Sequence, residues 1–239
     1  MRCLNLTLPT IAENCALDEA LLQEAESSGT PREVLRLWEM REPSVVLGRS
    51  SQVDRDVHRD ACDVAGVPIV RRSSGGAAIV CGPGCLMVSL VLSYERRPYL
   101  SPIDQAHQFV LQRHQAAIRP LAPGITIEGV SDLAVGGRKF SGNSMRCARD
   151  HVLYHGTLLY DFRLEMIDQL LTHPPREPDY RGHRPHAMFV TNLPIAGERL
   201  RFALMTAWNT EPPDNDWPQA IVEQLVTERY GQDTWSFRH

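Results

Sequence analysis

Three short segments combine residue types that could act on a phosphoryl or carbonyl oxygen. Residues 71–77 read RRSSGGA, residues 132–142 read DLAVGGRKFSG, and residues 155–157 read HGT. Glycines let a backbone approach a ligand closely and leave amide hydrogens available to an anion, and arginine forks suit phosphate. A lysine flanked by small residues can meet a developing negative charge with its own positive charge. In combination these types predict a site that handles charged oxygens.

Each segment taken alone also has an ordinary structural interpretation. RRSSGG is neither a P-loop, since it lacks GxxxxGK[ST], nor a dinucleotide fingerprint, since it lacks GxGxxG before a helix; it could be a surface turn. Lys139 could be a solvated lysine at a strand edge. His155 could be a structural histidine within a strand. The functional interpretation therefore depends on the three segments occurring together.

The composition is that of an ordinary folded protein. Of the 239 residues, 43% are hydrophobic and 23% are charged, with a formal net charge of -4. This balance argues against binding to nucleic acid or to a membrane surface, because both need a broad basic footprint. No membrane span or signal peptide is readable, so we expect a cytoplasmic protein. The six cysteines are scattered, and we expect free thiols rather than disulfides or zinc.

Apolar periodicity predicts several helices. The first is expected over 14–27, with Asn14 as its N-cap and with Asp18 and Glu19 mostly on its solvated side. The remaining helices are expected at 54–65, 103–121, 164–171 and 221–230. The proline-rich stretch 173–186 is expected to be a mobile loop that could form a lid.

Runs of β-branched residues predict strands that flank the three segments. Residues 34–40 and 44–48 are expected to pair as an antiparallel hairpin, and 77–80 and 86–92 are expected to pair around a Gly-Pro-Gly turn. The other strands are expected at 68–71, as two short strands with a Gly-Gly turn within 125–140, and at 152–159. Since no linker or repeat divides the chain, the fold predicted is α/β (α+β), with a mostly antiparallel mixed sheet flanked by helices in one domain, residues 1–239.

In order and spacing, the three segments resemble the lipoate-protein ligase A branch of the biotin/lipoate A/B protein ligase (acyltransferase) family. Members are also similar at NCALDEAL (14–21), VVLGR (45–49) and VTNL (190–193). The resemblance implies a single class II synthetase-like catalytic domain. The standard ligases often carry a C-terminal accessory domain of roughly a hundred residues, and because only about fifty residues follow residues 190–193 we expect no such domain here. It further implies that ATP and Mg²⁺ activate lipoate or octanoate to an acyl-adenylate. The acyl group would then pass to a lysine of a lipoyl domain of a 2-oxoacid dehydrogenase E2 subunit or of the glycine-cleavage H protein.

The resemblance also implies a role for each matching residue. Lys139 would be catalytic, stabilising charge on the α-phosphate and on the acyl carbonyl oxygen. Asp132 would help to hold magnesium or the adenylate, and His155 would lie against the ligand. The residues that would line the acyl-adenylate are Arg72, Ser73, Ser74, Gly75, Gly76, Ala77, Ser141, Gly142, Gly156 and Thr157. The residues expected to give the acyl chain apolar walls are Val46, Ile79 and Val88.

The chain departs from the family pattern at the end of the glycine segment, residues 71–77, and just after it. Ala77 replaces a third glycine, Cys81-Gly82 stands where the ligases carry His-Asp, and Gly84-Cys85 stands where they carry Gly-Asn. These changes remove hydrogen-bonding capacity, so activity could be altered or absent. Two alternatives follow: a cysteine-dependent octanoyltransferase of the same fold, with Cys81 as a displaced nucleophile, or a non-catalytic acyl- or carrier-binding homologue. A separate accessory subunit could also be required.

Overall fold

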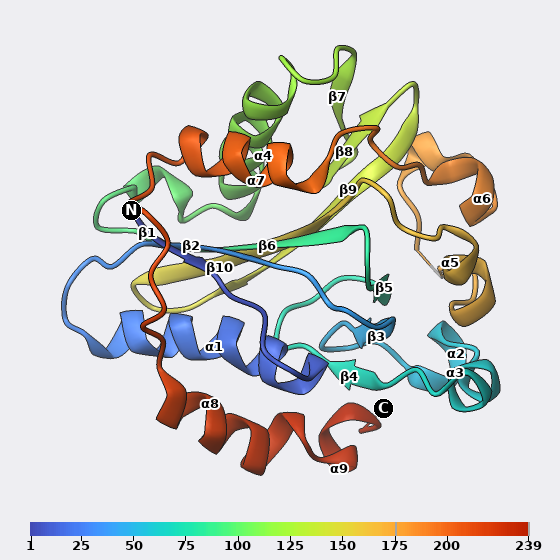
Figure 1. Ribbon diagram of the computed structural model, residues 1–239, viewed down its shortest axis with the longest axis horizontal. Coiled ribbons are helices and arrows are strands. Elements are labelled where there is room, and N and C mark those ends of the chain that lie inside the picture. Colours follow the sequence, from blue (N-terminus) through green and yellow to red (C-terminus); the bar gives the residue numbers. More distant parts are fainter. Residues whose placement is uncertain (175, 239) are drawn as a thin grey trace.

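A seven-stranded sheet forms the middle layer of the protein in the computed structural model, which describes residues 1–174 and 176–238 (Figure 1). The strand order is β1-β2-β6-β10-β9-β8-β7. The strands are β1 (Arg2–Asn5), β2 (Val34–Trp38), β6 (Cys85–Ser93), β7 (Ile125–Glu128), β8 (Asp132–Val135), β9 (Arg138–Cys147) and β10 (His151–Leu159). The β1–β2 pair is parallel and the other neighbours are antiparallel. The predicted mostly antiparallel mixed sheet is therefore confirmed.

A second sheet of three strands carries the glycine segment. Its order is β4-β3-β5, with β3 at Ser44–Leu47, β4 at Ile69–Arg71 and β5 at Ile79–Cys81. The two hairpins that we expected are wrong, because β2 pairs with β6 in the large sheet while β3 pairs with β5 in the small one. Proline and glycine turns predict where the chain reverses. Which strands then pair depends on which buried faces meet, and β2 and β3 are buried along their whole length.

Helices cover both faces of the large sheet (Figure 1). On one side lie α4 (Ile103–Ile118) and α7 (Gly197–Ala207), and on the other lie α1 (Ile11–Ser27), α8 (Gln219–Leu225) and α9 (Asp233–Ser236). The shorter helices are α2 (Val53–Asp56), α3 (Arg59–Ala65), α5 (Glu165–Leu170) and α6 (His186–Phe189). No helix within the described residues has both the length and the apolar character needed to cross a membrane.

Several expected elements are shifted or divided. The helix expected over 54–65 is two helices, although Gly66 does end the second one in the left-handed conformation, at φ 63°. The helix expected over 221–230 is α8 followed by a π-helical turn at Val226–Tyr230. Residues 125–140 form β7, β8 and the start of β9, and the stretch 173–186 contains one 3-10 turn, at Asp179–Arg181. Pro175 lies outside the described residues.

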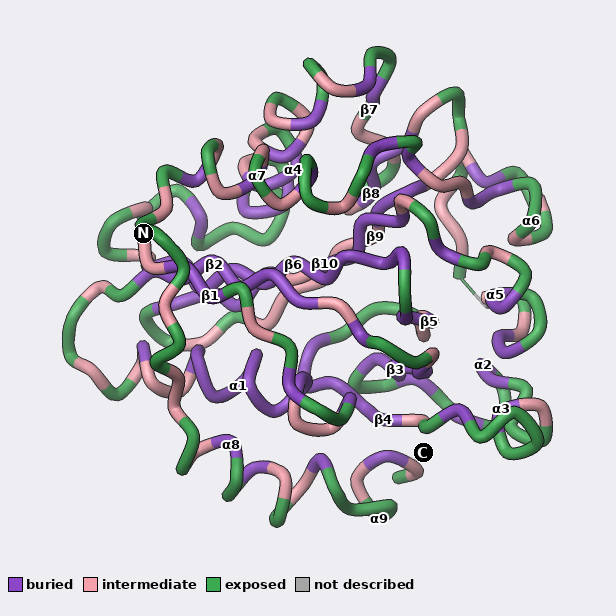
Figure 2. Tube along the Cα trace, in the orientation of Figure 1, coloured by how far each residue is buried: buried purple, intermediate pink, exposed green. Residues whose placement is uncertain are grey.

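The large sheet separates two hydrophobic cores, and the buried strands are visible through the middle of Figure 2. Side chains alternate along β6, because successive residues of a strand point to opposite faces. Met87 and Val91 face the core that contains α1 and the small sheet. Leu86 and Val88 face the core that contains α4 and α7. The candidate site lies on the α1 side.

The start of α1 differs from the prediction. Thr10 is the N-cap: its hydroxyl accepts a hydrogen bond from the Glu13 amide at 3.2 Å, and the Glu13 carboxylate accepts one from the Thr10 amide at 2.7 Å. Asn14 lies inside the helix and is buried, as are Asp18 and Glu19. The assignment of these acids to a solvated face is wrong, because α1 packs between the large sheet and the C-terminal segment 219–238.

Candidate active site

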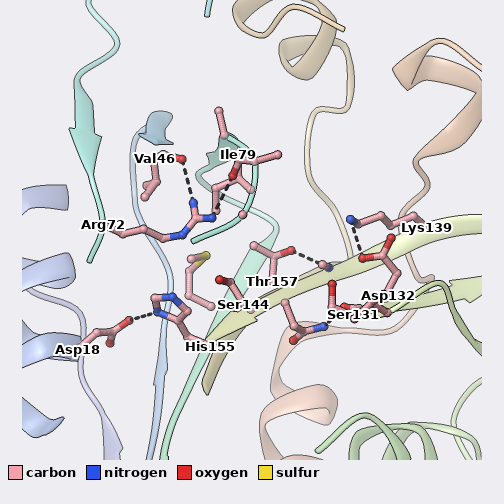
Figure 3. Close-up of a pocket in the computed structure, with 18 of the residues that line it drawn as sticks. Asp18, Val46, Arg72, Ile79, Ser131, Asp132, Lys139, Ser144, His155 and Thr157 are labelled. Carbon is pink, nitrogen blue, oxygen red and sulfur yellow. Dashed lines mark hydrogen bonds and ion pairs between the residues drawn. The ribbon is translucent and has the colours of Figure 1, made fainter. Parts of the chain in front are cut away.

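A cavity of about 420 Å³ lies where the three chemical segments meet (Figure 3). Its walls come from α1, β2, β3, β5, β6, the glycine segment, β8 to β10 and residues 176–178. The predicted site residues that line it are Arg72, Ser73, Gly76, Ala77, Asp132, Lys139, Gly142, His155, Gly156 and Thr157. Residues from all three segments are thus brought to one place, although the first segment is far from the other two in sequence, as the functional interpretation requires.

Three predicted site residues do not line the cavity but contact residues that do. Ser74 Oγ is 2.5 Å from His155 Nε2. The Gly75 carbonyl accepts a hydrogen bond from Ser144 Oγ at 2.9 Å, and Ser141 Oγ accepts one from Asn143 Nδ2 at 3.1 Å. These three residues support the lining rather than forming it.

The apolar part of the cavity differs from the prediction at one position. Val46 and Ile79 line it as expected, whereas Val88 faces the opposite core and its assignment is wrong. Met87 takes that place because the two side chains alternate along β6. Sequence reasoning also missed Cys15 and Trp38, which complete the apolar lining from α1 and β2. The sequence does not give the register of β6 against its neighbouring strands, and that register decides which of residues 87 and 88 faces the cavity.

Lys139 projects into the cavity from β9 and pairs with Asp132 on β8. Lys139 Nζ is 2.8 Å from Asp132 Oδ1, and Tyr180 Oη donates to Asp132 Oδ2 at 2.8 Å. The Lys139 side chain remains 29% exposed, so it can reach a ligand. A Cβ on Gly142 would lie 2.7 Å from Lys139 Nζ. Glycine at 142 therefore provides the space in which the lysine lies.

The two adjacent arginines, Arg71 and Arg72, face opposite ways and have different contacts. Arg72 lines the cavity, but its guanidinium donates to the Ala77 carbonyl at 3.0 Å, the Val46 carbonyl at 3.2 Å and Ser74 Oγ at 3.0 Å. Burial lowers the pKa of Arg72 to about 10, so it stays charged at neutral pH and organises the glycine segment.

Arg71 points away from the cavity, so of the two adjacent arginines only Arg72 lines it. Arg71 donates to the carbonyls of Gly48, Ser51 and Ser236 at 2.7–2.9 Å. Trp235 Nε1 in turn donates to the Arg71 carbonyl at 2.8 Å. The C-terminal segment 219–238 therefore braces the glycine segment from behind. In the sequence, the one indication that Arg71 and Arg72 face opposite ways is that successive residues of a strand alternate between its two faces.

A hydrogen-bonded chain runs from α1 to the glycine segment through His155, and Figure 3 shows its first link, between Asp18 and His155. Asp18 Oδ2 is 3.2 Å from His155 Nδ1, whose other ring nitrogen meets Ser74. Asp18 also accepts hydrogen bonds from Arg36 at 2.6 Å and from Ser89 at 2.7 Å. Burial alone would raise the pKa of Asp18, but Arg36, His155 and Ser89 together hold it below its usual value. In the sequence, the one indication of this role is that Asp18 follows Asn14 by four residues, which places both on the same face of the helix.

Substituting Asp18 with asparagine should destabilise the fold in a pH-dependent way. Removing one partner of a buried ion pair costs about 3–5 kcal/mol, and Arg36 is fully buried. Since the pKa of Asp18 is lowered on folding, its stabilisation is complete at neutral pH and is lost as the pH falls below the ordinary aspartate range. We expect chemical denaturation to give a large loss for Asp18→Asn at pH 7 and a smaller one near about pH 3.

The exposed substitution Asp54→Asn is the matched control for that measurement, since residue 54 lies at the solvent-facing start of α2. It should change the free energy of unfolding by less than about 0.5 kcal/mol. A loss for Asp18→Asn that is the same at both pH values would contradict the assignment of the charge.

A second, smaller chamber of about 160 Å³ adjoins the first. The two share Lys139, Thr157 and residues 77–79 as a common wall. The residues that line only the second chamber are mainly apolar and include Leu159, Ile167, Leu171, Phe189 and Val190. Arg181 also lines this chamber; its side chain is 3% exposed, and its Nη2 has no hydrogen-bond partner. Lys139 thus stands at the junction of an apolar cavity and a chamber with a buried donor.

The cysteines after the glycine segment do not reach either chamber. Cys81 and Cys85 are fully buried in the α1-side core, and burial raises the pKa of both thiols. Thiolate formation is therefore disfavoured, and the assignment of Cys81 as a displaced nucleophile is not supported. Among residues 1–174 and 176–238 no group of three or more His, Cys, Asp or Glu side chains is placed to hold a metal ion by itself.

Comparison with known proteins gives consistent matches along most of the chain. Residues 10–204 match the model of the lipoyl protein ligase A/B catalytic domain. An Aeropyrum pernix protein assigned as a lipoate-protein ligase A is 34% identical over 195 residues, covering 82% of this chain and 69% of that protein. The octanoyltransferase LipM of Halalkalibacterium halodurans is 23% identical, covering 95% of each protein.

Solved structures with the same fold include two of particular interest. The bipartite lipoate protein ligase from Thermoplasma acidophilum, determined in work that also covered its E2 lipoyl domain, superposes with a TM-score of 0.84 at 19% identity, covering 99% of this chain and 95% of that one. A lipoate-protein ligase A bound with ATP gives a TM-score of 0.78 at 21% identity, covering 99% and 98%. At these identities the likeness establishes the fold.

Proposed function

This chain belongs to the lipoyl protein ligase A/B catalytic-domain family, and from that premise we propose that it is a lipoate-protein ligase. It would activate lipoate or octanoate with ATP and pass the acyl group to a protein lysine. The observation that carries the proposal is the position of Lys139 at the junction of two adjoining chambers.

The two chambers differ in a way that suits the two substrates of such a ligase. The first has an apolar part formed by Cys15, Trp38, Val46 and Met87, which suits an acyl chain. The second offers apolar walls and the unpaired Arg181 Nη2, which suits a flat base with acceptor nitrogens. An acid and a nucleotide bound in this way would bring the carboxylate and the α-phosphate together beside Lys139.

Both chemical steps would then build charge next to the same ammonium group. In the first, a carboxylate oxygen of the acid forms a bond to the α-phosphorus, and the bond to the bridging oxygen breaks to release pyrophosphate. In the second, the acceptor amine bonds to the acyl carbon, loses a proton, and AMP leaves. Lys139 would stabilise the phosphoryl and carbonyl oxygens in turn, while Gly142 leaves it room to move.

Asp132 is the residue we propose to contact magnesium. Mg²⁺ often uses one or two carboxylates together with substrate phosphates, so a single protein carboxylate such as that of Asp132 can serve such a site. The ion would neutralise phosphate charge. In the described structure Asp132 binds Lys139 and Tyr180, so Lys139 Nζ would turn from Asp132 to the phosphate when the nucleotide binds.

We propose lipoyl domains of E2 subunits as the main acceptors, with the glycine-cleavage H protein as a second. The study of the Thermoplasma ligase together with an E2 lipoyl domain supports the first acceptor. A separate accessory subunit would be needed only if the chain alone is inactive. The unusual Cys81 and Cys85 line neither chamber, so the departures at these positions leave the proposed contacts in place.

ATP–pyrophosphate exchange tests this function directly. We expect exchange by the purified full-length chain to require lipoate or octanoate, and acyl transfer to a lipoyl domain to require ATP. Exchange without transfer would support the proposed formation of an acyl-adenylate and would indicate that transfer needs a separate accessory subunit. Absence of both, with tight binding of lipoate, would instead support a non-catalytic acyl-binding protein.

The octanoyltransferase alternative is favoured by the match to LipM over 95% of both proteins. If that chemistry operated, the nucleophile would have to be Cys15, which is the one cysteine lining either chamber within the described residues. Burial raises the pKa of the Cys15 thiol, which disfavours the thiolate.

We therefore expect Cys15→Ala to keep acyl transfer within about threefold of wild type. Cys147→Ala is the matched control, because residue 147 is exposed at the end of β9. The measurement is ATP-independent transfer from octanoyl-carrier protein alongside ATP-dependent transfer from octanoate. ATP-independent transfer by the wild-type protein that is lost in Cys15→Ala and kept in Cys147→Ala would favour the transferase.

A further inference from the structure

Four arginine or lysine side chains line the two chambers, and three of them are already engaged. Arg72 donates to its own segment, and Lys139 pairs with Asp132. Arg181 Nε is 3.3 Å from a Glu177 oxygen and donates to the Arg184 carbonyl at 2.9 Å. These three cations are held by the protein before any ligand arrives.

Arg176 is the fourth, and its situation is different. It lines both chambers and is exposed to solvent. Its guanidinium makes no hydrogen bond or ion pair with any other described residue. The adjacent Glu177 does not neutralise it, because that carboxylate faces Arg181, His173 at 3.4 Å and His183 at 2.6 Å.

The proposed reaction creates a need for such a cation. With the acyl chain and the base each in a chamber and the α-phosphate beside Lys139, the two outer phosphates must extend toward water. Three negatively charged phosphates in a row need more than one positive group, and Lys139, at the wall shared by the two chambers, is expected to act on the α-phosphate. An arginine with a free planar fork at the solvent edge of both chambers matches that requirement.

We propose that Arg176 binds the β- and γ-phosphates of ATP and the pyrophosphate that leaves. This inference depends on the proposed ligase function and deepens it by dividing the work between two cations. Lys139 acts on the α-phosphate and on the acyl carbonyl, whereas Arg176 acts on the outer phosphates alone. Arg176 therefore contributes to adenylation and has no part in transfer from an adenylate already formed.

That division gives a test with two assays. The first is lipoate-dependent ATP–pyrophosphate exchange, and the second is transfer to an E2 lipoyl domain from supplied lipoyl-adenylate. For Arg176→Ala we expect exchange to fall at least about tenfold, with a higher KM for ATP, because charge-assisted hydrogen bonds to phosphate are lost. Transfer from supplied adenylate should stay within about twofold of wild type.

Two further variants sharpen the result. Arg176→Lys should recover part of the exchange activity, since it keeps the charge but loses the fork. Arg96→Ala removes an exposed arginine that lines neither chamber and should behave as wild type. The deficit of Arg176→Ala should shrink at high salt, because an exposed charge is screened.

Unchanged exchange in Arg176→Ala would overturn the inference, and so would an equal loss in both assays. Failure of the proposed function has a different signature. In that case the wild-type protein itself would show no exchange, whatever its rate of transfer from supplied adenylate. That outcome overturns both proposals together, whereas a negative result in the variant alone overturns only the role of Arg176.

Discussion

Lys139→Ala should lower both adenylation and acyl transfer by at least about 100-fold, the scale of losing one electrostatic contact to a transition-state oxyanion. The reason is its position: Lys139 Nζ borders both chambers, where the two reacting centres would meet. The fold should persist, since the side chain is 29% exposed and Asp132 keeps its hydrogen bond from Tyr180. Exchange, transfer from supplied adenylate and a thermal melt together measure these outcomes.

Arginine is not expected to replace this lysine. Of the 25 lysine and arginine residues in the chain, Lys139 is the one lysine and the other 24 are arginines. A compact ammonium with three rotatable donors can serve two oxygens in succession, whereas a planar fork is fixed to one geometry. Lys139→Arg should therefore also lose most activity.

The matched control for Lys139→Ala is Arg149→Ala. It breaks another ion pair, Arg149 with Asp150 at 2.7 Å, on an exposed turn away from both chambers. It should keep full activity. Activity of Lys139→Ala within about twofold of wild type would refute the proposed catalytic role.

Gly48→Ala should cause the second-largest loss, although residue 48 lines neither chamber. A Cβ there would collide with the Gly76 carbonyl, so the glycine segment would have to move. Overpacking of this kind costs about 1–3 kcal/mol. The loss in kcat/KM should be larger than this stability change suggests, because displacing a binding segment by about 1 Å can cost about 100-fold.

A destabilising change on the other side of the sheet separates the two effects. Val110→Ala removes buried volume from α4, in the core opposite the site, and should cost a comparable amount of stability. We expect Val110→Ala to retain its kcat/KM at temperatures where it is folded. Equal activity losses in Gly48→Ala and Val110→Ala would mean that instability, and not the position of the glycine segment, explains the first.

Much of the candidate site could be predicted from the sequence because its residues are local features. The glycine segment, the Gly-Gly turn before Lys139 and the small residue after His155 each follow from what a few adjacent residues allow the backbone to do. The resemblance to a family then predicted that the three segments form one site, and in the structure residues from all three line the same cavity.

Other members of the site could not be found in this way. Asp18 was assigned to solvent because it is charged, yet Arg36 and His155 from two distant strands make its burial favourable. Arg176 lies in a proline-rich stretch with no local pattern, and its importance depends on which other cations are already paired.

The sequence by itself determined the kinds of element, the turns, the single lysine and the order of the chemical segments. Only the tertiary structure decided which strands pair, which of two adjacent arginines faces the cavity, and which acids are buried. The physical reason is that backbone preference acts over a few bonds, so neighbouring residues specify it. The free energy of burying a charge or pairing a strand depends instead on partners tens of residues away, which are known only once the sheet and its helices are assembled.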